Sequence, residues 1–334
     1  MLFLNGTFRI NSFKAAISNI MGDNFIVKIG LFLPQLGVQA TRENVIQLAM
    51  EAEEEGFDSL WVLERLVWPL KPQVPYPVTP DGSLPVEYQN VFDPLDLLTF
   101  VAANTKKIAL GTSVIDMLFH NPVILARRFA TLDILSQGRV ICGLGIGWSK
   151  DEYQITNVPF ERRGARADEF IQALRRIWAD DVVEFMGEFY KIPSSKIGPK
   201  PMQKPHPPIY LGGFTPKTFS RIVKYASGWL GVVAGPLEYL ESSVKMLRDE
   251  ARRLGKDPDK FKIIVLTSPQ VMDSGAKGDQ RFPMTGTIEE VGSDLQRMKD
   301  MGVDHVVFNY NFSPDGRDIK KVIDTTKELS KAAR

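Results

Sequence analysis

Two glycines followed by Thr215 and Pro216, at the end of a predicted strand, could hold an anion. Gly212 and Gly213 close the apolar run 207–213, and Thr215 opens a predicted helix. Adjacent glycines leave backbone N–H groups free to point at a phosphate, and the helix N-terminus adds the positive end of its dipole. The same residues also fit an ordinary strand-to-helix turn in which Thr215 only caps the helix. A phosphate site is therefore predicted, with the plain turn as the alternative.

Glycines also end the predicted strand 139–147, where the chain reads GLGIGW from Gly143 to Trp148. This run is a weak match to a dinucleotide-binding turn, because Trp148 stands where that motif requires its third glycine. Small residues at a strand end let a ligand or a neighbouring side chain approach the backbone closely. We therefore expect Gly145, Gly147 and Trp148 to lie beside a ligand.

Small polar residues end the predicted strand 107–115, in the order Gly111, Thr112, Ser113 and Val114. They are unusual in a strand that is otherwise apolar. One interpretation is a β-bulge with no further role. The other is that Ser113 and Val114 present their backbone to a flat ring.

Charged and titratable side chains follow the ends of three predicted strands. Glu64 and Arg65 come directly after the second strand and form either ligand contacts or an ion pair at the rim. His120 follows the third strand and could contact a substrate, although a histidine in a loop is more often simply solvated. Asp151 and Glu152 follow the fourth strand, and they orient a ligand or cap the next segment.

These side chains must be positioned by the elements before them, and the chain alternates apolar strands with amphipathic helices. The predicted strands are 25–33, 58–63, 107–115, 139–147, 207–213, 228–233, 261–267 and 303–308. The predicted helices are 41–56, 94–104, 122–136, 163–178, 216–226, 237–254, 287–301 and 319–333. Eight such pairs predict an α/β fold, a (βα)₈ TIM barrel with its site at the carboxyl ends of the strands. An open doubly wound sheet is the rival, but the first strand lacks the Gly-x-Gly-x-x-Gly turn that usually follows it there.

Three insertions interrupt the alternation, after the second strand, the fourth helix and the seventh strand. Residues 64–92 are rich in proline and residues 268–286 in glycine. Long irregular loops in a compact domain usually carry function or are disordered, and we expect 64–92 to cover the site. Residues 25–334 are assigned to one barrel domain. Residues 1–24 are assigned to an N-terminal extension, with a weak transit peptide as the alternative.

The composition argues against several classes of function. With 41 basic and 40 acidic residues, the net charge of +1 gives no electrostatic reason to expect nucleic acid or an acidic membrane as a partner. Cys142 is the single cysteine, and His120, His206 and His305 lie far apart, so no metal site is expected. His206 and His305 lie near strand starts and are expected to be structural. Without a clear targeting signal or a bilayer-spanning apolar run, the predicted location is cytoplasmic.

Together these segments resemble the luciferase-like monooxygenase superfamily, and within it the branch that uses the 5-deazaflavin coenzyme F420. The segments are KIGLFLPQLG (28–37), EEEGFDSLWVLERL (53–66), YPVTPDGSLP (76–85), DPLDLLTFVAANTKKIALGTSVI (93–115), NPVILARRFATLDILSQGRVICGLGIGWSKDEY (121–153) and PKPMQKPHPPIYLGG (199–213). Their joint occurrence in this order carries the resemblance, which covers most of the chain.

The resemblance implies a flavin-type ring at the barrel mouth, no metal, and a small-molecule substrate. It implies that Gly212, Gly213 and Thr215 hold the cofactor phosphate. It also implies a bulge that backs the ring, with a non-prolyl cis peptide at Ser113–Val114. Members of this family often pair as homodimers, so a homodimer is expected.

Two positions depart from the sugar-phosphate dehydrogenases of this branch. Glu64 and Arg65 align with an Asp-His pair there, and Trp148 stands where those enzymes carry a glutamate acid. Both departures argue against sugar-phosphate oxidation and leave the proton donor without an assignment. Glu64, Arg65 and His120 are then the expected polar contacts near the substrate.

The leading hypothesis is an F420-dependent oxidoreductase that transfers a hydride between the deazaflavin C5 and an unidentified small organic substrate. The residues expected to bind the cofactor are Ser113, Val114, Gly145, Gly147, Trp148, Asp151, Gly212, Gly213 and Thr215. The first alternative is an FMN-dependent two-component monooxygenase of the same superfamily. The second is a barrel that binds a flavin or a phosphorylated ligand without turnover. Trp148, in place of an acid, favours this last reading, whereas the lid-like insertions count against it.

Overall fold

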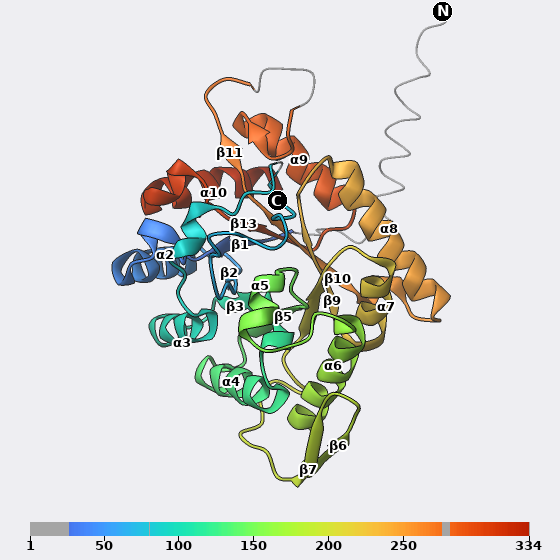
Figure 1. The fold of residues 1–334 in the computed structure, drawn as a ribbon. Helices are drawn as coiled ribbons and strands as arrows, with labels where there is room; N and C mark the ends of the chain where they lie inside the picture. Colours follow the sequence, from blue (N-terminus) through green and yellow to red (C-terminus); the bar gives the residue numbers. More distant parts are fainter. Residues whose placement is uncertain (1–26, 80, 276–280, 334) are drawn as a thin grey trace, which may run out of the picture.

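A computed structural model describes residues 27–79, 81–275 and 281–333, and helices surround a central barrel of parallel strands (Figure 1). The barrel strands are β1 (Lys28–Phe32), β2 (Ser59–Val62), β3 (Ala109–Thr112), β4 (Ile115–Asp116), β5 (Val140–Gly145), β8 (Ile209–Gly212), β9 (Gly228–Val232), β10 (Lys262–Thr267) and β13 (His305–Phe308). The helices are α2 (Arg42–Glu54), α3 (Pro94–Asn104), α4 (Pro122–Leu135), α5 (Lys150–Ile155), α6 (Arg163–Ala179), α7 (Pro216–Tyr225), α8 (Leu237–Arg253), α9 (Ile288–Asp300) and α10 (Ile319–Ala333).

The barrel closes through a pairing between β3 and β5. Its strands follow the order β3-β2-β1-β13-β10-β9-β8-β5-β4, and Leu110 of β3 lies opposite Val140 of β5. An open sheet would leave two unpaired edges at this point. The closed (βα)₈ barrel is therefore confirmed, and the doubly wound alternative is wrong.

The predicted strand 107–115 is divided into two pieces. β3 pairs with β2, and after a break at Ser113 and Val114, β4 continues beside β5, with Asp116 opposite Gly145. A bulge of this kind turns the strand locally and re-aims the side chains that follow it. Here it brings Asp116 to the end of the strand.

The helices begin at the capping residues that the sequence offers. Thr41 accepts a hydrogen bond from the backbone N–H of Asn44 at the start of α2, and Thr287 and Glu290 form the predicted capping box of α9. Helix α5 was not predicted; its N-cap Ser149 accepts a bond from the N–H of Glu152. Since α5 follows β5 directly, it stands at the carboxyl end of the barrel.

Each insertion has a distinct form. The one after α6 is a hairpin of β6 (Val183–Met186) and β7 (Lys191–Ser195), which projects at the bottom of Figure 1. The insertion after β10 contains the short pair β11 (Gln270–Val271) and β12 (Thr285–Gly286), and its residues 276–280 lie outside the described part. Single-turn 3₁₀ helices are η1 (Gly37–Gln39), η2 (Val86–Gln89), η3 (Met117–Phe119), η4 (Pro258–Lys260) and η5 (Pro314–Arg317).

The buried Gln35, just beyond β1, holds both ends of the insertion after β2. Its amide nitrogen donates to the carbonyls of Leu63 and Phe92, each at 2.7 Å, and its oxygen accepts from the N–H of Leu63 at 2.8 Å. Buried side-chain amides with every bond satisfied fix the groups that they join. The insertion 64–92 therefore leaves and re-enters the barrel at one anchored point.

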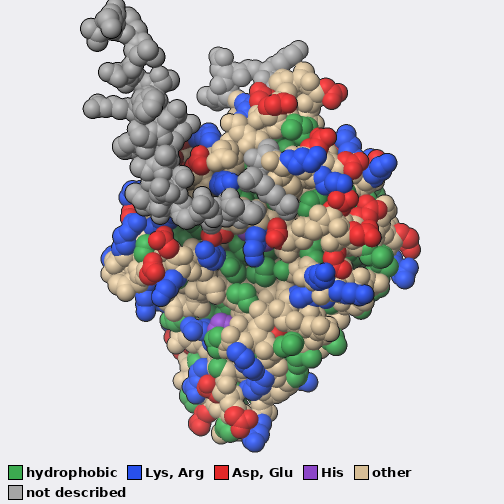
Figure 2. All heavy atoms as spheres, turned by 180° about the vertical axis from the view of Figure 1, so that it is seen from behind, with side chains coloured by type: hydrophobic (Ala, Val, Ile, Leu, Met, Phe, Trp, Pro, Cys, Tyr) green, Lys and Arg blue, Asp and Glu red, His purple; other side chains and the backbone are tan. Residues whose placement is uncertain are grey.

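The opposite side of the molecule shows basic and acidic side chains interspersed rather than separated by sign (Figure 2). This distribution agrees with the balanced composition. None of the described helices is both long enough and apolar enough to cross a membrane. The predicted extension 1–24 lies outside the described residues.

Candidate functional site

A cavity of about 770 Å³ lies at the carboxyl ends of the barrel strands. Its wall combines strand ends with part of the insertion 64–92, as expected for a barrel whose site lies at that face. The predicted site residues that line it are Glu64, Arg65, Ser113, Val114, Gly145, Gly147, Trp148, Gly212 and Gly213. Three other predicted site residues do not line it: His120, Asp151 and Thr215.

One wall of the cavity is backbone rather than side chain. The peptide bond between Ser113 and Val114 is cis, as the resemblance implies. Ser113 donates its N–H to the carbonyl of Val62 at 2.7 Å, and the Val114 carbonyl accepts from the N–H of Glu64 at 3.1 Å. These two bonds fix the bulge to the segment that carries the charged pair.

Glycines complete this wall because a side chain would not fit. A methyl group on Gly145 would lie 2.5 Å from Cγ2 of Val114 and 2.7 Å from Oδ1 of Asp116. Gly147 has φ of +70°, a conformation that side chains disfavour, and its methyl group would meet the ring of Phe119 at 2.8 Å. The cavity is therefore bounded here by backbone that a flat ligand can approach.

The turn from β8 into α7 combines the two interpretations that the sequence left open. The exposed Thr215 is the N-cap of α7, with its hydroxyl accepting from the N–H of Thr218 at 3.2 Å. Within the described part of the chain, the backbone N–H groups of Gly213 and Phe214 have no hydrogen-bond acceptor. Free N–H groups at a helix N-terminus are suited to binding an anion. The cap is thus confirmed, and the same turn has the donors that a phosphate requires.

Five titratable side chains lie beside the cavity in two bonded sets, here together called the mouth cluster. Its members are Glu64, Arg65, Asp116, His120 and Glu152. A buried charge is costly unless it is paired and hydrogen-bonded, so the partner of each side chain decides whether its charge is stable there.

Glu64 holds two elements of the mouth cluster together. One carboxylate oxygen accepts from the backbone N–H of Asp116 at 2.9 Å, and the other lies 2.8 Å from Nε2 of His120. The side chain of His120 is 17 % exposed, whereas that of Glu64 is 4 % exposed. His120 therefore lies between Glu64 and solvent, and it positions Glu64 rather than facing the cavity.

Arg65 forms a buried ion pair with Glu152 of α5. Its Nη1 lies 2.6 Å from a Glu152 carboxylate oxygen, and the two side chains are 8 % and 1 % exposed. The other Glu152 oxygen accepts from the N–H of Leu66 at 2.8 Å. Burial raises the pKa of Glu152, and the adjacent guanidinium opposes that rise. The open question about Arg65 is settled in part: it is in an ion pair, and it also lines the cavity.

Aromatic rings surround the guanidinium and shape the cavity beside it. The carbon of the Arg65 guanidinium lies 5.1 Å from the ring centroids of both Tyr88 and Trp148. Tyr76 donates to or accepts from the Tyr88 hydroxyl at 3.1 Å, and Phe312 packs edge-on against Tyr88. Burial is the main cause that raises the pKa of Tyr88, which keeps it neutral. The insertion 64–92 thus contributes an apolar, aromatic surface to the cavity.

Asp116 is the site residue that sequence reasoning missed. It is 6 % exposed and lines the cavity, and the backbone N–H of Gly147 donates toward its carboxyl. Burial and the negative charge of Glu64 raise its pKa to about 8. The sequence did offer one indication. Asp116 comes directly after the predicted strand 107–115, and barrel enzymes carry catalytic groups at strand ends.

Asp151 does not line the cavity but binds the insertion 64–92. Its carboxylate accepts from the backbone N–H of Gln73 at 3.0 Å and from the Gln73 amide at 3.2 Å. Both contacts are exposed. Asp151 therefore contributes to the site by holding 64–92 against α5.

The two remaining histidines lie away from the cavity. His305 of β13 is buried and bonded to Ser59 at 2.8 Å, and His206 precedes β8. Burial lowers the pKa of both rings, and that of His305 falls to about 3. Both rings are neutral at physiological pH. Among the described residues, no group of histidine, cysteine, aspartate and glutamate side chains is placed to hold a metal ion.

Comparison with known proteins places this geometry in a family. The family described as luciferase-like monooxygenase matches residues 27–305. An uncharacterised protein of Mycobacterium tuberculosis (strain ATCC 25618 / H37Rv) is 38 % identical over 209 residues, 62 % of this chain and 73 % of the relative. The F420-dependent glucose-6-phosphate dehydrogenase of Amycolatopsis mediterranei (strain U-32) is 32 % identical over 203 residues, 58 % of this chain and 54 % of the relative.

A solved structure shares the fold over almost the whole chain. It is an F420-dependent secondary alcohol dehydrogenase in complex with an F420–acetone adduct, superimposed with a TM-score of 0.74. The match covers 92 % of this chain and 99 % of that one at 22 % sequence identity. At this identity the likeness establishes the barrel and no more.

Proposed function

Because the chain belongs to the luciferase-like monooxygenase family, whose members are oxidoreductases, we propose that it is an F420-dependent oxidoreductase. It would transfer a hydride between the deazaflavin and a small organic substrate. The relative from Amycolatopsis mediterranei, named as F420-dependent, supports this choice of cofactor. The observation that carries the proposal is the backbone wall of the cavity, formed by Ser113, Val114 and the facing glycines.

The residues at this wall fit a flat tricyclic ring. Side chains are absent at Gly145 and Gly147, where a methyl group would collide with its neighbours. Gly212 completes the set, since its methyl group would lie 3.3 Å from Cγ1 of Val114. Close approach of backbone to a ligand is a common reason for glycine at such places. Val114 and these glycines would hold the ring.

The turn into α7 fits the cofactor phosphate. The N–H groups of Gly213 and Phe214 are free in the described structure, and the helix dipole favours a negative charge there. When bound, the deazaflavin supplies a hydride donor or acceptor at C5, and the protein supplies orientation and electrostatics. The insertion 64–92, held by Gln35 at its two ends and by Asp151 at Gln73, would shield the bound cofactor from water.

Titration with oxidised F420, followed by its fluorescence, tests the proposal. We expect saturable binding at micromolar concentration, and its absence would refute the proposed function. Gly212→Ala should weaken binding by at least about tenfold, or about 1.4 kcal/mol, because the methyl group enters the ring site. Gly198→Ala is the matched control, because a methyl group there meets no atom within 4 Å.

The FMN-dependent monooxygenase is the second candidate, and the family description itself favours it. The wall and the phosphate turn would serve reduced FMN equally well. Preferential binding of reduced FMN, with oxygen consumption, would select this candidate over the first. The homodimer and the cytoplasmic location stay predictions of the sequence.

A further inference from the structure

We propose that Asp116 is the acid–base catalyst of this site, and that it exchanges a proton with the oxygen of an uncharged carbonyl substrate. The proposal rests on the proposed function, because it assumes a hydride transfer in the same cavity. It assigns the proton donor that neither Trp148 nor the aligned Glu64–Arg65 pair provides.

The position of Asp116 is set by Glu64, Gly147 and Gly145. Its own N–H is bound by the Glu64 carboxylate at 2.9 Å, and the Gly147 N–H donates toward its carboxyl. Oδ1 lies where a side chain of Gly145 would project, at 2.7 Å from that methyl position. The absence of a side chain at Gly145 thus leaves the Asp116 carboxyl at the wall that would face the ring. A general acid must lie within hydrogen-bond reach of the reacting group, and this wall gives that access.

The groups that surround Asp116 favour its protonated form at neutral pH. Glu64 and Glu152 raise its pKa, Arg65 lowers it, and burial raises it most. Tyr153 of α5 also interacts with it, and His120 reaches it only through Glu64. The result is a pKa of about 8, close to the pH at which an acid–base catalyst is most effective.

The other members of the mouth cluster are less suited to this role. The Arg65 guanidinium stays protonated and is bound to Glu152. Glu64 uses both oxygens, one on Asp116 and one on His120. His120 does not line the cavity. Within the mouth cluster, Asp116 is the carboxyl that lines the cavity and is not held by a side-chain partner in the described structure.

The proton transfer balances with a hydride transfer. In the reducing direction the carbonyl carbon receives a hydride with two electrons, and a C–H bond forms as the C=O π pair moves to oxygen. That oxygen takes the proton from a carboxyl oxygen of Asp116, which becomes a carboxylate. A bound reduced deazaflavin would supply the hydride and its two electrons, and its C5–H bond would break. The reverse direction returns the proton to Asp116 and the hydride to the oxidised deazaflavin.

The charge of the lining selects an uncharged substrate. Arg65 is the single cation among the described lining residues, and its charge is balanced by Glu152. Three carboxyl side chains, Glu64, Glu87 and Asp116, also line the cavity. A phosphate or carboxylate on the substrate would meet no unpaired cation there and would be repelled. The aromatic surface of Tyr76, Tyr88 and Phe312 instead suits an apolar carbonyl compound.

The ionisation of Asp116 can be measured without turnover. In protein labelled with ¹³Cγ-aspartate, we expect one carboxyl resonance to titrate near pH 8, apart from those of the exposed aspartates. Asp116→Asn should remove this resonance, and Asp133→Asn, at a buried aspartate that does not line the cavity, should leave it. Glu64→Gln should shift the midpoint to lower pH, because it removes a negative charge. A carboxyl that titrates in the ordinary range for aspartate would overturn the proposal.

The kinetic test uses reduced F420 with a panel of uncharged ketones and enones, and with glucose 6-phosphate as the charged probe. Asp116→Asn should lower kcat by about 10²- to 10⁴-fold while KM and the affinity for F420 change little. In the wild type, reduction should fall and alcohol oxidation should rise through the same pH, about 8. Wild-type activity in Asp116→Asn, or turnover confined to glucose 6-phosphate, would overturn the proposal.

Failure of the proposed function gives a different result. In that case the wild type, Asp116→Asn and Asp133→Asn would all fail to bind F420. If the wild type binds F420 but turns over no member of the uncharged panel, the cofactor assignment stands and the substrate class is wrong. If it turns over the panel with no change in Asp116→Asn, the catalyst is wrong.

Discussion

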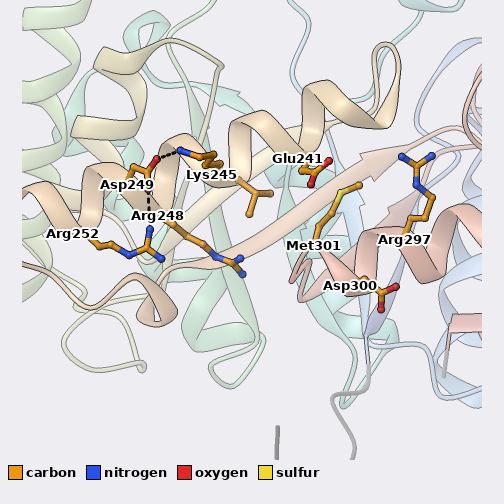
Figure 3. A pocket seen from close by; sticks show the side chains of 9 residues that line it. Glu241, Lys245, Arg248, Asp249, Arg252, Arg297, Asp300 and Met301 are labelled. Atoms are coloured by element: carbon orange, nitrogen blue, oxygen red, sulfur yellow. Dashed lines mark hydrogen bonds and ion pairs between the residues drawn. The ribbon is translucent and has the colours of Figure 1, made fainter. Parts of the chain in front are cut away.

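Two charged clusters of this molecule contain similar side chains and have opposite properties. The mouth cluster is buried in the barrel, whereas a groove of about 540 Å³ between α8 and α9 carries its charges on the surface. Figure 3 shows the groove, in which the side chain of Asp249 lies between those of Lys245 and Arg252. These three side chains are 49–76 % exposed, whereas Arg65 and Glu152 are at most 8 % exposed. The two clusters therefore carry similar charges and differ in burial.

The difference follows from solvation. In the groove, Lys245 lies 2.5 Å and Arg252 2.9 Å from Asp249, and water screens both pairs. The pKa of Asp249 is lowered by Lys245, as expected for a carboxylate that stays ionised beside cations. In the mouth cluster, burial opposes ionisation, and the pKa values of Asp116 and Glu152 are raised. The same residue type is a solvated anion in one cluster and an acid in the other.

The largest expected effect breaks the ion pair of the mouth cluster. Arg65→Met leaves the Glu152 charge buried without a partner, and we expect a loss of about 3–5 kcal/mol in the free energy of unfolding at neutral pH. Because the variant raises the folded-state pKa of Glu152 further, the loss should be present at neutral pH and shrink as the pH falls. Urea unfolding at two pH values measures this. The double variant Arg65→Met/Glu152→Gln should recover most of the loss, and no recovery would show that packing rather than charge is responsible.

Asp116→Asn should raise the free energy of unfolding, whereas Arg65→Met should lower it. Its pKa is about 8 in the folded protein and about 3.9 in an unfolded chain, so between these values only the unfolded state is ionised. The stabilisation that the protonated carboxyl gives the folded state is therefore complete below about pH 4 and lost as the pH rises to about 8. We expect the variant to be more stable by roughly 1–3 kcal/mol at neutral pH, with the difference vanishing in acid.

The control for this effect is Asp133→Asn. Asp133 is buried, and its two oxygens accept from the backbone N–H and the amide of Gln203 at 2.9 and 2.7 Å. An amide can accept at one of these places only, so this variant should be destabilised. If both variants were destabilised alike, Asp116 would be an ordinary buried, bonded carboxylate. Stabilisation on removal of a functional group is the trade-off expected at an active site.

Ser59, Trp61 and His305 form a buried group of uncharged polar side chains, which can be compared with the two charged clusters. Ser59 lies between the Trp61 indole N–H, at 2.6 Å, and Nε2 of His305, at 2.8 Å. Ser59→Ala should cost about 1–3 kcal/mol, because two buried polar groups lose their partner, and the affinity for F420 should be unchanged. Denaturant unfolding and F420 titration measure the two quantities. A large loss of F420 affinity would contradict the expectation that Ser59, Trp61 and His305 act apart from the cavity.

His305 adds a pH dependence of its own. Its folded-state pKa is about 3 against about 6.5 in an unfolded chain, so the unfolded state alone takes up a proton between these values. The stability that the neutral ring contributes is present above pH 6.5 and is lost as the pH falls toward 3. His305→Gln should flatten the decline in unfolding free energy over this window, and an unchanged slope would count against the shift.

The sequence predicted the barrel well because strand and helix periodicity are local properties. It predicted less of the mouth cluster, since Arg65 and Glu152 are 87 residues apart and their pairing exists only after the barrel closes. Helix α5 was not predicted because its six residues are too few for a clear apolar period. Ser149 and Glu152 nevertheless have the spacing of a capping box. Asp116 was adjacent to a predicted strand end, but burial and the proximity of Glu64, which raise its pKa, are tertiary effects.

The smallest effect is expected for a substitution in the groove of Figure 3. It tests directly whether an exposed charge matters less than a buried one. Arg252→Ala removes one of two cations beside Asp249, and Lys245 remains at 2.5 Å. Since water and salt already screen the pair, we expect no measurable change in the urea midpoint, in F420 affinity or in turnover. Arg65→Met removes one guanidinium as well, so the two variants differ mainly in burial. An effect of Arg252→Ala on F420 binding would mean that the groove belongs to the site, and the contrast between buried and solvated charge would no longer locate function in this barrel.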